Sequence, residues 1–290
     1  MGIEDCLNSK TDIFTVEDDF SFTFTDERDN EYRLIAEEIS KDTGINMDYI
    51  YSSIYNSYLS HWHKVDGEWY YFKCEGDYYH SIRELLGEVI SNYFHLESVP
   101  YKIGKKISNG KEEYGVVSKN FYDKNSRYKR VWDYGIQLNK DLFIYDALWV
   151  ICSDMDNYHS LSTDLKKLMV RDFYSSEGDR MAYNFLIQEK NGKKKLAPLY
   201  DYSLSFEFVN PYYRSEIGVI HLNDKKCIQK IRDDYEFQYL FQQLMDINME
   251  VFLQEVEDRH HISLSGDEWQ YFTKYDKDMK KLVRSRKIIK

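Results

Sequence analysis

Residues 178–206 read GDRMAYNFLIQEKNGKKKLAPLYDYSLSF, and this stretch decides the fold. Within it, Asn191-Gly192 separates two runs that can each form a strand, NFLIQEK and KKKLAPLY. Asn-Gly is the strongest short-range signal of a β-hairpin, because both residues tolerate the positive φ of a type I′ turn. The sequence therefore predicts a hairpin with a two-residue loop at Asn191-Gly192.

The register of this hairpin brings polar side chains together. With a two-residue loop, facing residues have numbers that add up to 383, so Asn184 lies opposite Leu199. Asp201 follows two residues later on the same face, which makes Asn184 and Asp201 diagonal neighbours about 7–8 Å apart. Asp179 comes five residues before Asn184, in the loop that enters the first strand. These side chains supply hard oxygen ligands suited to Mg²⁺, with one carboxylate to spare.

The order Asp-x4-Asn, hairpin, Asp resembles the catalytic centre of phosphotransferases of the protein-kinase type. In that class the first Asp accepts the proton of the substrate hydroxyl, and the Asn and the last Asp hold Mg²⁺. The same residue types also occur in ordinary surface hairpins, where they are solvated. The register that places Asp201 beside Asn184 favours catalysis, with Asp179 as the base and Asn184 and Asp201 as the metal ligands.

A kinase also needs a cation for the nucleotide phosphates, held on a strand by a helix Glu. The run EWYYFKCE is typical of a strand and carries Lys73 near its end. A helix with an apolar stripe from Ile82 to Phe94 follows, and Ser81 with Glu84 predicts a capping box at its start. We expect Lys73 to pair with Glu84, with Glu88 one turn further on as the alternative partner.

The segment GVVSKNF, residues 115–121, lies where such a fold has the hinge whose backbone binds the adenine. Val117 and Lys119 are the candidate nucleotide-binding residues there. The four elements stand in the order that a kinase requires: Lys73, its helix Glu, the hinge and the metal-binding hairpin. Taken separately, Lys73 could be a solvated strand end, Glu84 part of a helix cap, and the hairpin an ordinary surface hairpin.

The periodicity predicts an α+β fold in two parts. Residues 1–120 are β-rich, with hairpins around Asp66-Gly67 and at residues 108–110, and contain the helix that starts near Ser81. Residues 121–290 are mostly helical, as in 162–174 and 228–258, with the Asn191-Gly192 hairpin embedded among the helices. We expect an N-lobe that binds the nucleotide phosphates and a C-lobe that carries catalysis and the metal.

Composition narrows the class of protein. The 290 residues are 42% hydrophobic and 31% charged, which is typical of a globular chain. A net charge of −11 disfavours non-specific nucleic-acid binding, so no nucleic-acid partner is expected. The sequence has no signal-peptide pattern, no apolar run near 18 residues and no CxxC, which favours a cytoplasmic protein without a membrane segment. The basic run KKLVRSRKIIK is interpreted as a helix end followed by a frayed tail.

GDRMAYNFLI followed by KLAPLYDYSLSF resembles the catalytic core of the HipA-like serine/threonine kinases, in the short form similar to CtkA-type kinases. The resemblance extends more weakly over about residues 50–285. It implies a two-lobed, protein-kinase-like fold and transfer of the γ-phosphate of ATP, with Mg²⁺, to a Ser or Thr hydroxyl of a protein or of the chain itself. It also implies that Asp179 is the base, that Asn184 and Asp201 are the Mg²⁺ ligands, and that Lys73 binds phosphate.

Two features depart from the family pattern. Met181 stands where the family has His, and the glycine-rich phosphate loop has no good counterpart. We expect side chains between Ser52 and Lys64, among them Ser53 and Ser57, to bind the phosphates in place of that loop and to be targets of self-phosphorylation. The departures leave two alternatives open, a pseudokinase that acts as a nucleotide- or protein-binding regulatory module, and a kinase for a lipid or small molecule.

Overall fold

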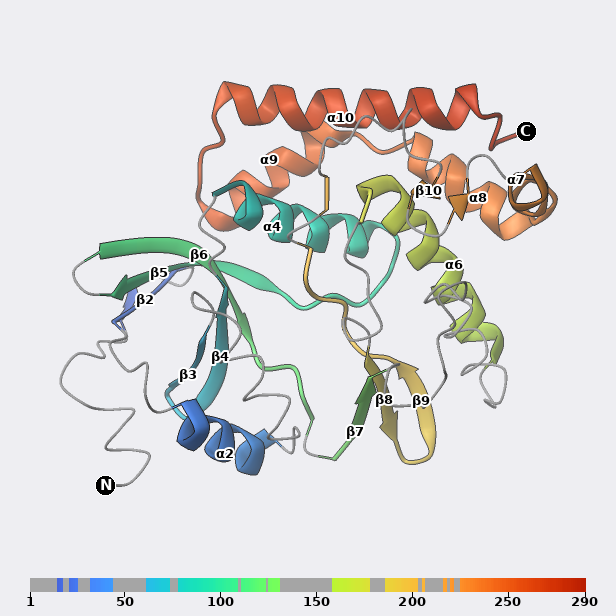
Figure 1. Ribbon diagram of the computed structural model, residues 1–290. Coiled ribbons are helices and arrows are strands. Elements are labelled where there is room, and N and C mark those ends of the chain that lie inside the picture. The colour runs from blue at the N-terminus through green and yellow to red at the C-terminus, as the bar shows by residue number, and fades with distance from the viewer. Residues whose placement is uncertain are drawn as a thin grey trace. The chain divides into compact units, whose positions relative to one another are not determined.

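The computed structural model describes part of the chain, and that part forms two compact units (Figure 1). Unit 1 comprises Met1–Leu85 and Val99–Tyr128, and unit 2 comprises Leu86–Ser98 and Lys129–Lys290. The described residues are 15–17, 21–25, 32–43, 61–73, 78–108, 111–123, 125–130, 158–177, 186–202, 205–206, 216–217, 220–221 and 225–290.

Unit 1 is built on a six-stranded sheet with the strand order β1-β2-β5-β6-β4-β3. Its neighbours are antiparallel except for β2 and β5, which are parallel. The strands are β1 (Thr15–Glu17), β2 (Ser21–Thr25), β3 (His61–Val65), β4 (Glu68–Lys73), β5 (Tyr101–Ser108) and β6 (Lys111–Lys119). Helix α2 (Tyr32–Thr43) belongs to the same unit. The indole N–H of Trp69 on β4 donates a hydrogen bond to the side chain of Asp42, near the C-terminal end of α2.

Both hairpins predicted for the first part are present. Strands β3 and β4 pair with Val65 opposite Glu68, and the two loop residues have the positive φ values of a type I′ turn, 50° at Asp66 and 81° at Gly67. Strands β5 and β6 pair up to Ser108 opposite Lys111, which again leaves a two-residue loop.

Helix α4 (Tyr78–Tyr93) carries the apolar stripe predicted from the sequence. The stripe residues that are fully or almost fully buried are Ile82, Leu85, Leu86, Val89, Ile90 and Phe94. The predicted capping box is wrong, because the helix begins at Tyr78 and Ser81 therefore lies in its first turns, buried, rather than at the N-cap. The carboxylate of Glu84 is consequently available for another partner. The division between the units also falls within this helix, so residues 86–98 group with unit 2.

Unit 2 is mostly helical and contains α6 (Tyr158–Ser175), α7 (Lys225–Asp233), α8 (Tyr235–Met245), α9 (Met249–His260) and α10 (Gly266–Ser285) (Figure 1). Strands β8 (Leu186–Lys190) and β9 (Lys193–Leu196) form the predicted hairpin in a sheet of order β7-β8-β9, where β7 is Arg127–Arg130. Two short strands, β10 (Glu216–Ile217) and β11 (Ile220–His221), pair with each other.

Three of these helices begin with side-chain caps that the sequence supplies. Asp234 accepts a hydrogen bond from the backbone of Phe237 at the start of α8, and Asn248 caps α9 in the same way. Ser265 and Glu268 form a full capping box at the start of α10. No described helix is both long and apolar enough to cross a lipid bilayer.

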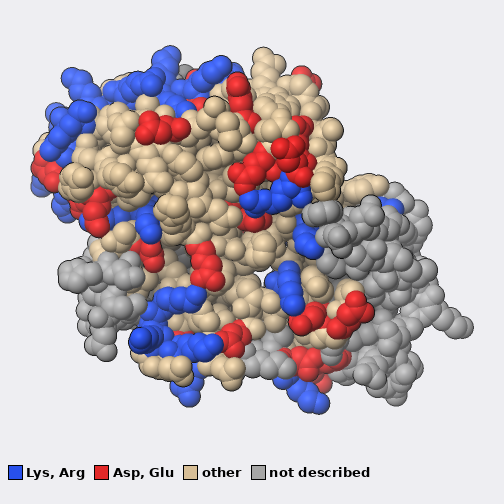
Figure 2. Space-filling view, turned by 180° about the vertical axis from the view of Figure 1, so that it is seen from behind, with Lys and Arg blue, Asp and Glu red and all other residues tan. Residues whose placement is uncertain are grey.

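The C-terminal residues are docked, so the interpretation as a frayed tail is wrong. Ile288 is fully buried, and its backbone N–H donates to the carbonyl of Val283. Gln238 on α8 donates to the carbonyl of Ile288 and accepts from the backbone of Lys290. Four basic residues of this region are exposed, Lys281, Arg284, Lys287 and Lys290, and Figure 2 shows basic side chains gathered near the end of α10.

An ion-pair cluster joins α6 to α8. Lys166 Nζ lies 2.6 Å from Asp234 Oδ2 and 2.5 Å from Glu236 Oε2. Burial opposes the charge on Lys166, but the two hydrogen bonds prevail and raise its pKa above the usual 10.5. Burial likewise opposes the charge on Asp234, yet the hydrogen bond from Lys166 lowers the pKa of that carboxyl below 3.8, and the same lysine lowers the pKa of Glu236 below 4.5.

These directions fix how stability should depend on pH. The two carboxylates stabilise the folded chain at pH values above the pKa that each has in the unfolded chain. This stabilisation is lost as pH falls through the lower pKa that each has in the folded chain. The raised pKa of Lys166 adds stability that is lost only as pH rises through it, so the cluster should act between about pH 5 and pH 10. We expect Lys166→Met to lower the free energy of unfolding at pH 7 by about 1 kcal/mol, since the carboxylates are partly exposed, and by less at pH 3.5.

Urea unfolding at both pH values measures this difference. Lys167→Met is the matched control, because Lys167 lies next on the same helix and, among the described residues, its ion pair is with Asp164 three residues earlier, 3.0 Å away. It should cost no more than about 0.5 kcal/mol. An equal loss in Lys166→Met at pH 7 and pH 3.5 would contradict the assigned ion pairs.

Candidate active site

Lys73 and Glu84 form the contact that the sequence predicts. Lys73 is the last residue of β4, and its Nζ lies 2.6 Å from Oε1 of Glu84 on α4. The Glu84 side chain is 1% exposed and that of Lys73 is 12% exposed, so the pair is held away from bulk water. In such surroundings a charged hydrogen bond is short and strong, and it fixes the ammonium group.

The backbone of Lys73 is also fixed, by close packing against β6. Lys73 pairs with Val116 in the ladder, and the neighbouring Gly115 lies directly against the Lys73 carbonyl group. A Cβ on Gly115 would lie 3.0 Å from the carbonyl carbon of Lys73 and closer still to its oxygen, a contact that real side chains do not make. Glycine at this position is therefore required by the approach of β4 to β6.

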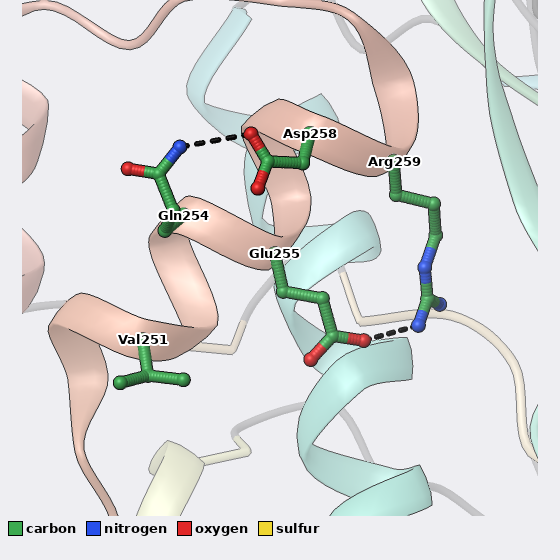
Figure 3. A pocket seen from close by; sticks show the side chains of 5 residues that line it. All are labelled: Val251, Gln254, Glu255, Asp258 and Arg259. Carbon is green, nitrogen blue, oxygen red and sulfur yellow. Dashed lines mark hydrogen bonds and ion pairs between the residues drawn. The ribbon is translucent and has the colours of Figure 1, made fainter.

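Glu88, the alternative partner of Lys73, is paired elsewhere. Its Oε1 lies 3.0 Å from Nη1 of Arg259 on α9, and Arg259 also bonds Glu255 one turn earlier on that helix. Arg259 and Glu255 line a shallow hollow on α9 together with Val251, Gln254 and Asp258 (Figure 3). The hollow is lined by one helix and already satisfied by local pairs, so it is not a candidate for catalysis.

The predicted hinge forms the second half of β6 and the residues after it. Val117 is buried and lies in register with Phe72 on β4 and Lys102 on β5, so the sheet surrounds it on both sides. Lys119 is exposed, and its Nζ lies 3.3 Å from Oε1 of Glu68. The ladder with β4 ends at Lys119, and Asn120 still donates its backbone N–H to the carbonyl of Trp69. The roles of Val117 and Lys119 in nucleotide binding remain predictions.

The hairpin has the register predicted from the sequence. Its ladder runs from Ile187 opposite Leu196 to Lys190 opposite Lys193, and every facing pair adds up to 383. The loop residues Asn191 and Gly192 have φ values of 52° and 76°, as a type I′ turn requires.

After β9 the chain changes its neighbour. Ala197 still donates to the carbonyl of Leu186, but Leu199 donates to the carbonyl of Glu97 and forms an isolated parallel bridge with Ser98. This second attachment leads the chain to Asp201, which is half-buried and has a left-handed backbone, with φ 63°. Asp201 is thus placed by two sets of backbone hydrogen bonds.

Several predicted site residues lie outside the described part of the chain: Asp179, Met181, Asn184, Ser53 and Ser57. Of the two predicted Mg²⁺ ligands, the structure therefore places only Asp201. Its carboxylate has the chemistry that Mg²⁺ prefers. Among the described residues there is no group of three or more His, Cys, Asp or Glu side chains that could hold a metal ion. A site completed by the amide of Asn184 remains a prediction.

Tyr202, directly after Asp201, anchors this segment in unit 2. It is fully buried, and its hydroxyl lies 3.2 Å from Ser91 Oγ and 2.8 Å from Ser98 Oγ. Its ring packs on Gly87 of α4, where an added Cβ would lie 2.6 Å from Tyr202 Cβ. The glycine inside an amphipathic helix was the only sequence signal of this contact, since such a glycine often marks a close approach.

Helix α10 supports the segments next to the predicted site. Tyr271 Oη donates to the carbonyl of Phe206 at 2.6 Å, and Tyr275 Oη donates to the carbonyl of Tyr174 at 2.7 Å. Tyr174 donates in turn to Asp276, and burial followed by the charge of that carboxylate raises the pKa of Tyr174 well above its usual 10.0. The end of α6 is therefore tied to α10 by buried hydrogen bonds, and Phe206 by a partly buried one.

The structure resembles two solved kinases at low sequence identity. One is HipA of Shewanella oneidensis MR-1, solved in a complex of the toxin–antitoxin system with HipB and operator DNA, with a TM-score of 0.52 and 10% identity over 75% of this chain. The present chain spans 58% of that HipA chain. The other is the proinflammatory kinase CtkA of Helicobacter pylori, with a TM-score of 0.50 and 13% identity over 79% of this chain and 90% of CtkA.

No family model matches the sequence, and no curated protein sequence matches it either. The likeness is therefore one of fold, and it agrees with the arrangement predicted from the sequence, a β-rich unit that carries Lys73 and a mostly helical unit that carries the Asp201 hairpin. The α+β class is confirmed, and the chain has the kinase-like fold of HipA and CtkA.

Proposed function

We propose that this protein is an ATP- and Mg²⁺-dependent kinase that transfers the γ-phosphate to a Ser or Thr hydroxyl of a protein or of the chain itself. The observation that carries the proposal is the ion pair of Lys73 and Glu84, 2.6 Å long and almost fully withdrawn from water, in a fold shared with HipA and CtkA. An ion pair buried between strand and helix adds little to stability, because both charges must leave water. An ammonium group held in a fixed orientation is, however, well suited to bind nucleotide phosphates.

Each residue of the predicted site would have its own role in phosphotransfer. Lys73 would bind the phosphates of ATP, and Glu84 would hold its ammonium group in place. Asp179 would accept the proton of the acceptor hydroxyl as the bond to phosphorus forms. Asp201 and Asn184 would hold Mg²⁺, which when bound neutralises charge on the phosphates. These roles are supported by the sequence pattern, by the Lys73–Glu84 contact and by the hairpin ladder between residues 187 and 196.

Intact-mass analysis after incubation with Mg-ATP tests the proposal, with the chain alone and with added protein acceptors. We expect added phosphate on the chain or an acceptor, and Asp201→Asn should lower transfer about 10²–10³-fold by weakening metal binding. Asp258→Asn on α9 is the control and should leave transfer unchanged, since Asp258 bonds Gln254 on its own helix. Nucleotide binding without transfer would favour a pseudokinase, and transfer to a lipid or sugar alone would favour a small-molecule kinase.

The same samples identify the acceptor residues. Mapping of phosphorylated peptides would show whether Ser53 or Ser57 is modified, as expected for hydroxyls beside the γ-phosphate. A phosphate there adds about −1.5 to −2 units of charge where ATP has to bind, so self-phosphorylation would inhibit the kinase. Transfer to an acceptor while residues 52–60 stay unmodified would exclude this inhibition and leave the kinase proposal intact.

A further inference from the structure

Arg171, near the end of α6, is a fully buried charge in unit 2. Its Nη1 lies 2.7 Å from Asp172 Oδ1 and 3.6 Å from Glu177 Oε2, and both carboxylates are about 1% exposed. The guanidinium lies over the ring of Tyr202, with its central carbon 4.2 Å from the ring centroid. A single side chain thus uses one nitrogen for two carboxylates and also lies over an aromatic ring.

These contacts connect the segment that precedes Asp179 to the segment that follows Asp201. Glu177 comes two residues before Asp179, and Tyr202 comes directly after Asp201. A further bond joins the same segments, because Ser205 Oγ donates to Glu177 Oε2. Phe206 also donates its backbone N–H to the carbonyl of Ser175 at 2.5 Å. Arg171 is the cation at the centre of this junction.

Stability does not explain why the residue is an arginine. Its Nε and Nη2 atoms are buried and have no hydrogen-bond partner among the residues that the structure describes. Leaving charged donors buried without partners is unfavourable, and a well-packed apolar side chain of similar volume often replaces a buried ion pair without loss of stability. Buried polar groups without a partner are rare in folded proteins and call for an explanation, of which a functional role is one.

We propose that Arg171 is a positioning residue, which sets the spacing between the segment entering Asp179 and the segment leaving Asp201. The inference rests on the proposed kinase function for its catalytic consequence, but the junction itself is a property of unit 2. Attraction to Asp172 and Glu177 holds the end of α6, and the cation–π contact with Tyr202 holds the backbone next to Asp201. A displacement of either segment by about 1 Å would change the distance between the predicted base Asp179 and the predicted Mg²⁺ ligand Asp201 enough to slow transfer.

Arg171→Met and Arg171→Lys test the proposal, since methionine keeps much of the volume and lysine keeps the charge without the planar face. Hydrogen–deuterium exchange of peptides within 172–177 and 201–206 is the readout that does not depend on activity. We expect exchange in both segments to become at least about tenfold faster in Arg171→Met, with α9 unchanged. In phosphotransfer, kcat should fall about 10- to 100-fold with little change in the KM for the acceptor. Arg171→Lys should be intermediate in both measurements.

Lys166→Met is the matched control, because it removes a cation five residues earlier on the same helix whose ion pairs go to α8. Its expected stability loss should speed the exchange of the two segments by no more than about fivefold, and kcat should stay unchanged. Unchanged exchange in Arg171→Met, or faster exchange in one segment alone, would overturn the proposal. If Arg171→Met does not fold, Glu177→Gln applies the same test, and unchanged exchange in 201–206 overturns it. A wild-type chain without phosphotransfer would defeat the kinase proposal alone, since the exchange result stands by itself.

Discussion

Replacement of Asp179 by alanine should lower the rate of phosphotransfer about 10²–10⁴-fold, which is the usual contribution of a positioned general base. The reason is that an acceptor hydroxyl must lose its proton as it attacks phosphorus, and a carboxylate placed beside it both orients the hydroxyl and accepts that proton. Asp179 does not hold the phosphates in this proposal, so the dissociation constant of Mg-ATP should change less than about threefold. Single-turnover kinetics with calorimetric ATP binding measures the two quantities separately.

Asp172→Asn is an instructive comparison for Asp179, because it removes the charge of a carboxylate seven residues earlier that contacts Arg171 rather than an acceptor. It should affect transfer through the Arg171 junction, by about 10-fold or less, and not eliminate it. If Asp179→Ala transfers phosphate at the wild-type rate, Asp179 is not the base. The kinase proposal would then need another carboxylate near Asp201.

The second large effect should come from separating Lys73 from Glu84. Lys73→Met should lower transfer about 10²–10³-fold, because the phosphates lose a preorganised cation in a site where charge is weakly screened. It should also lower the free energy of unfolding by about 3 kcal/mol, since Glu84 is left as a buried carboxylate without its lysine. Transfer assays and urea unfolding on the same preparation measure both losses.

A double variant separates these two losses. Lys73→Met with Glu84→Leu removes both charges from the buried site, so stability should return to within about 1 kcal/mol of the wild type while transfer stays low. Glu88→Gln is the matched single change on the same helix, and it breaks the pair with Arg259 instead of the pair with Lys73. It should reduce transfer far less than Lys73→Met does. Recovery of transfer in the double variant would show that Lys73 acts only through stability.

The sequence predicted the local pieces of the fold well, because their signals lie within a few residues. Asn191-Gly192 and Asp66-Gly67 each require positive φ and each define a two-residue loop, so the register of both hairpins followed by counting. The apolar stripe of α4 identified a helix correctly. Its start was predicted wrongly, since a serine three residues before a glutamate also occurs inside a helix, and here Glu84 pairs with Lys73 instead of capping.

Contacts between residues distant in sequence were beyond sequence reasoning. Arg171 lies on a helix where an arginine is ordinarily expected on the surface, and nothing near it in the sequence indicates Tyr202 or Glu177 as partners. The docking of Ile288 against α8 was missed for a similar reason. A run of basic residues predicts an exposed segment, and a single isoleucine among them does not reveal that it is buried. The Lys73–Glu84 pair was predictable only because its two elements follow each other directly along the chain.

The left-handed backbone of Asp201 decides which substitutions can test its carboxylate. At φ 63° an alanine or a branched residue would strain the chain by about 1 kcal/mol or more, so its phenotype would mix a lost ligand with a distorted backbone. Asparagine tolerates this conformation and differs from aspartate mainly in charge, while glycine tolerates it and lacks any side chain. A metal role predicts that Asn and Gly variants at Asp201 share one defect, and a purely conformational role predicts that both behave as the wild type does.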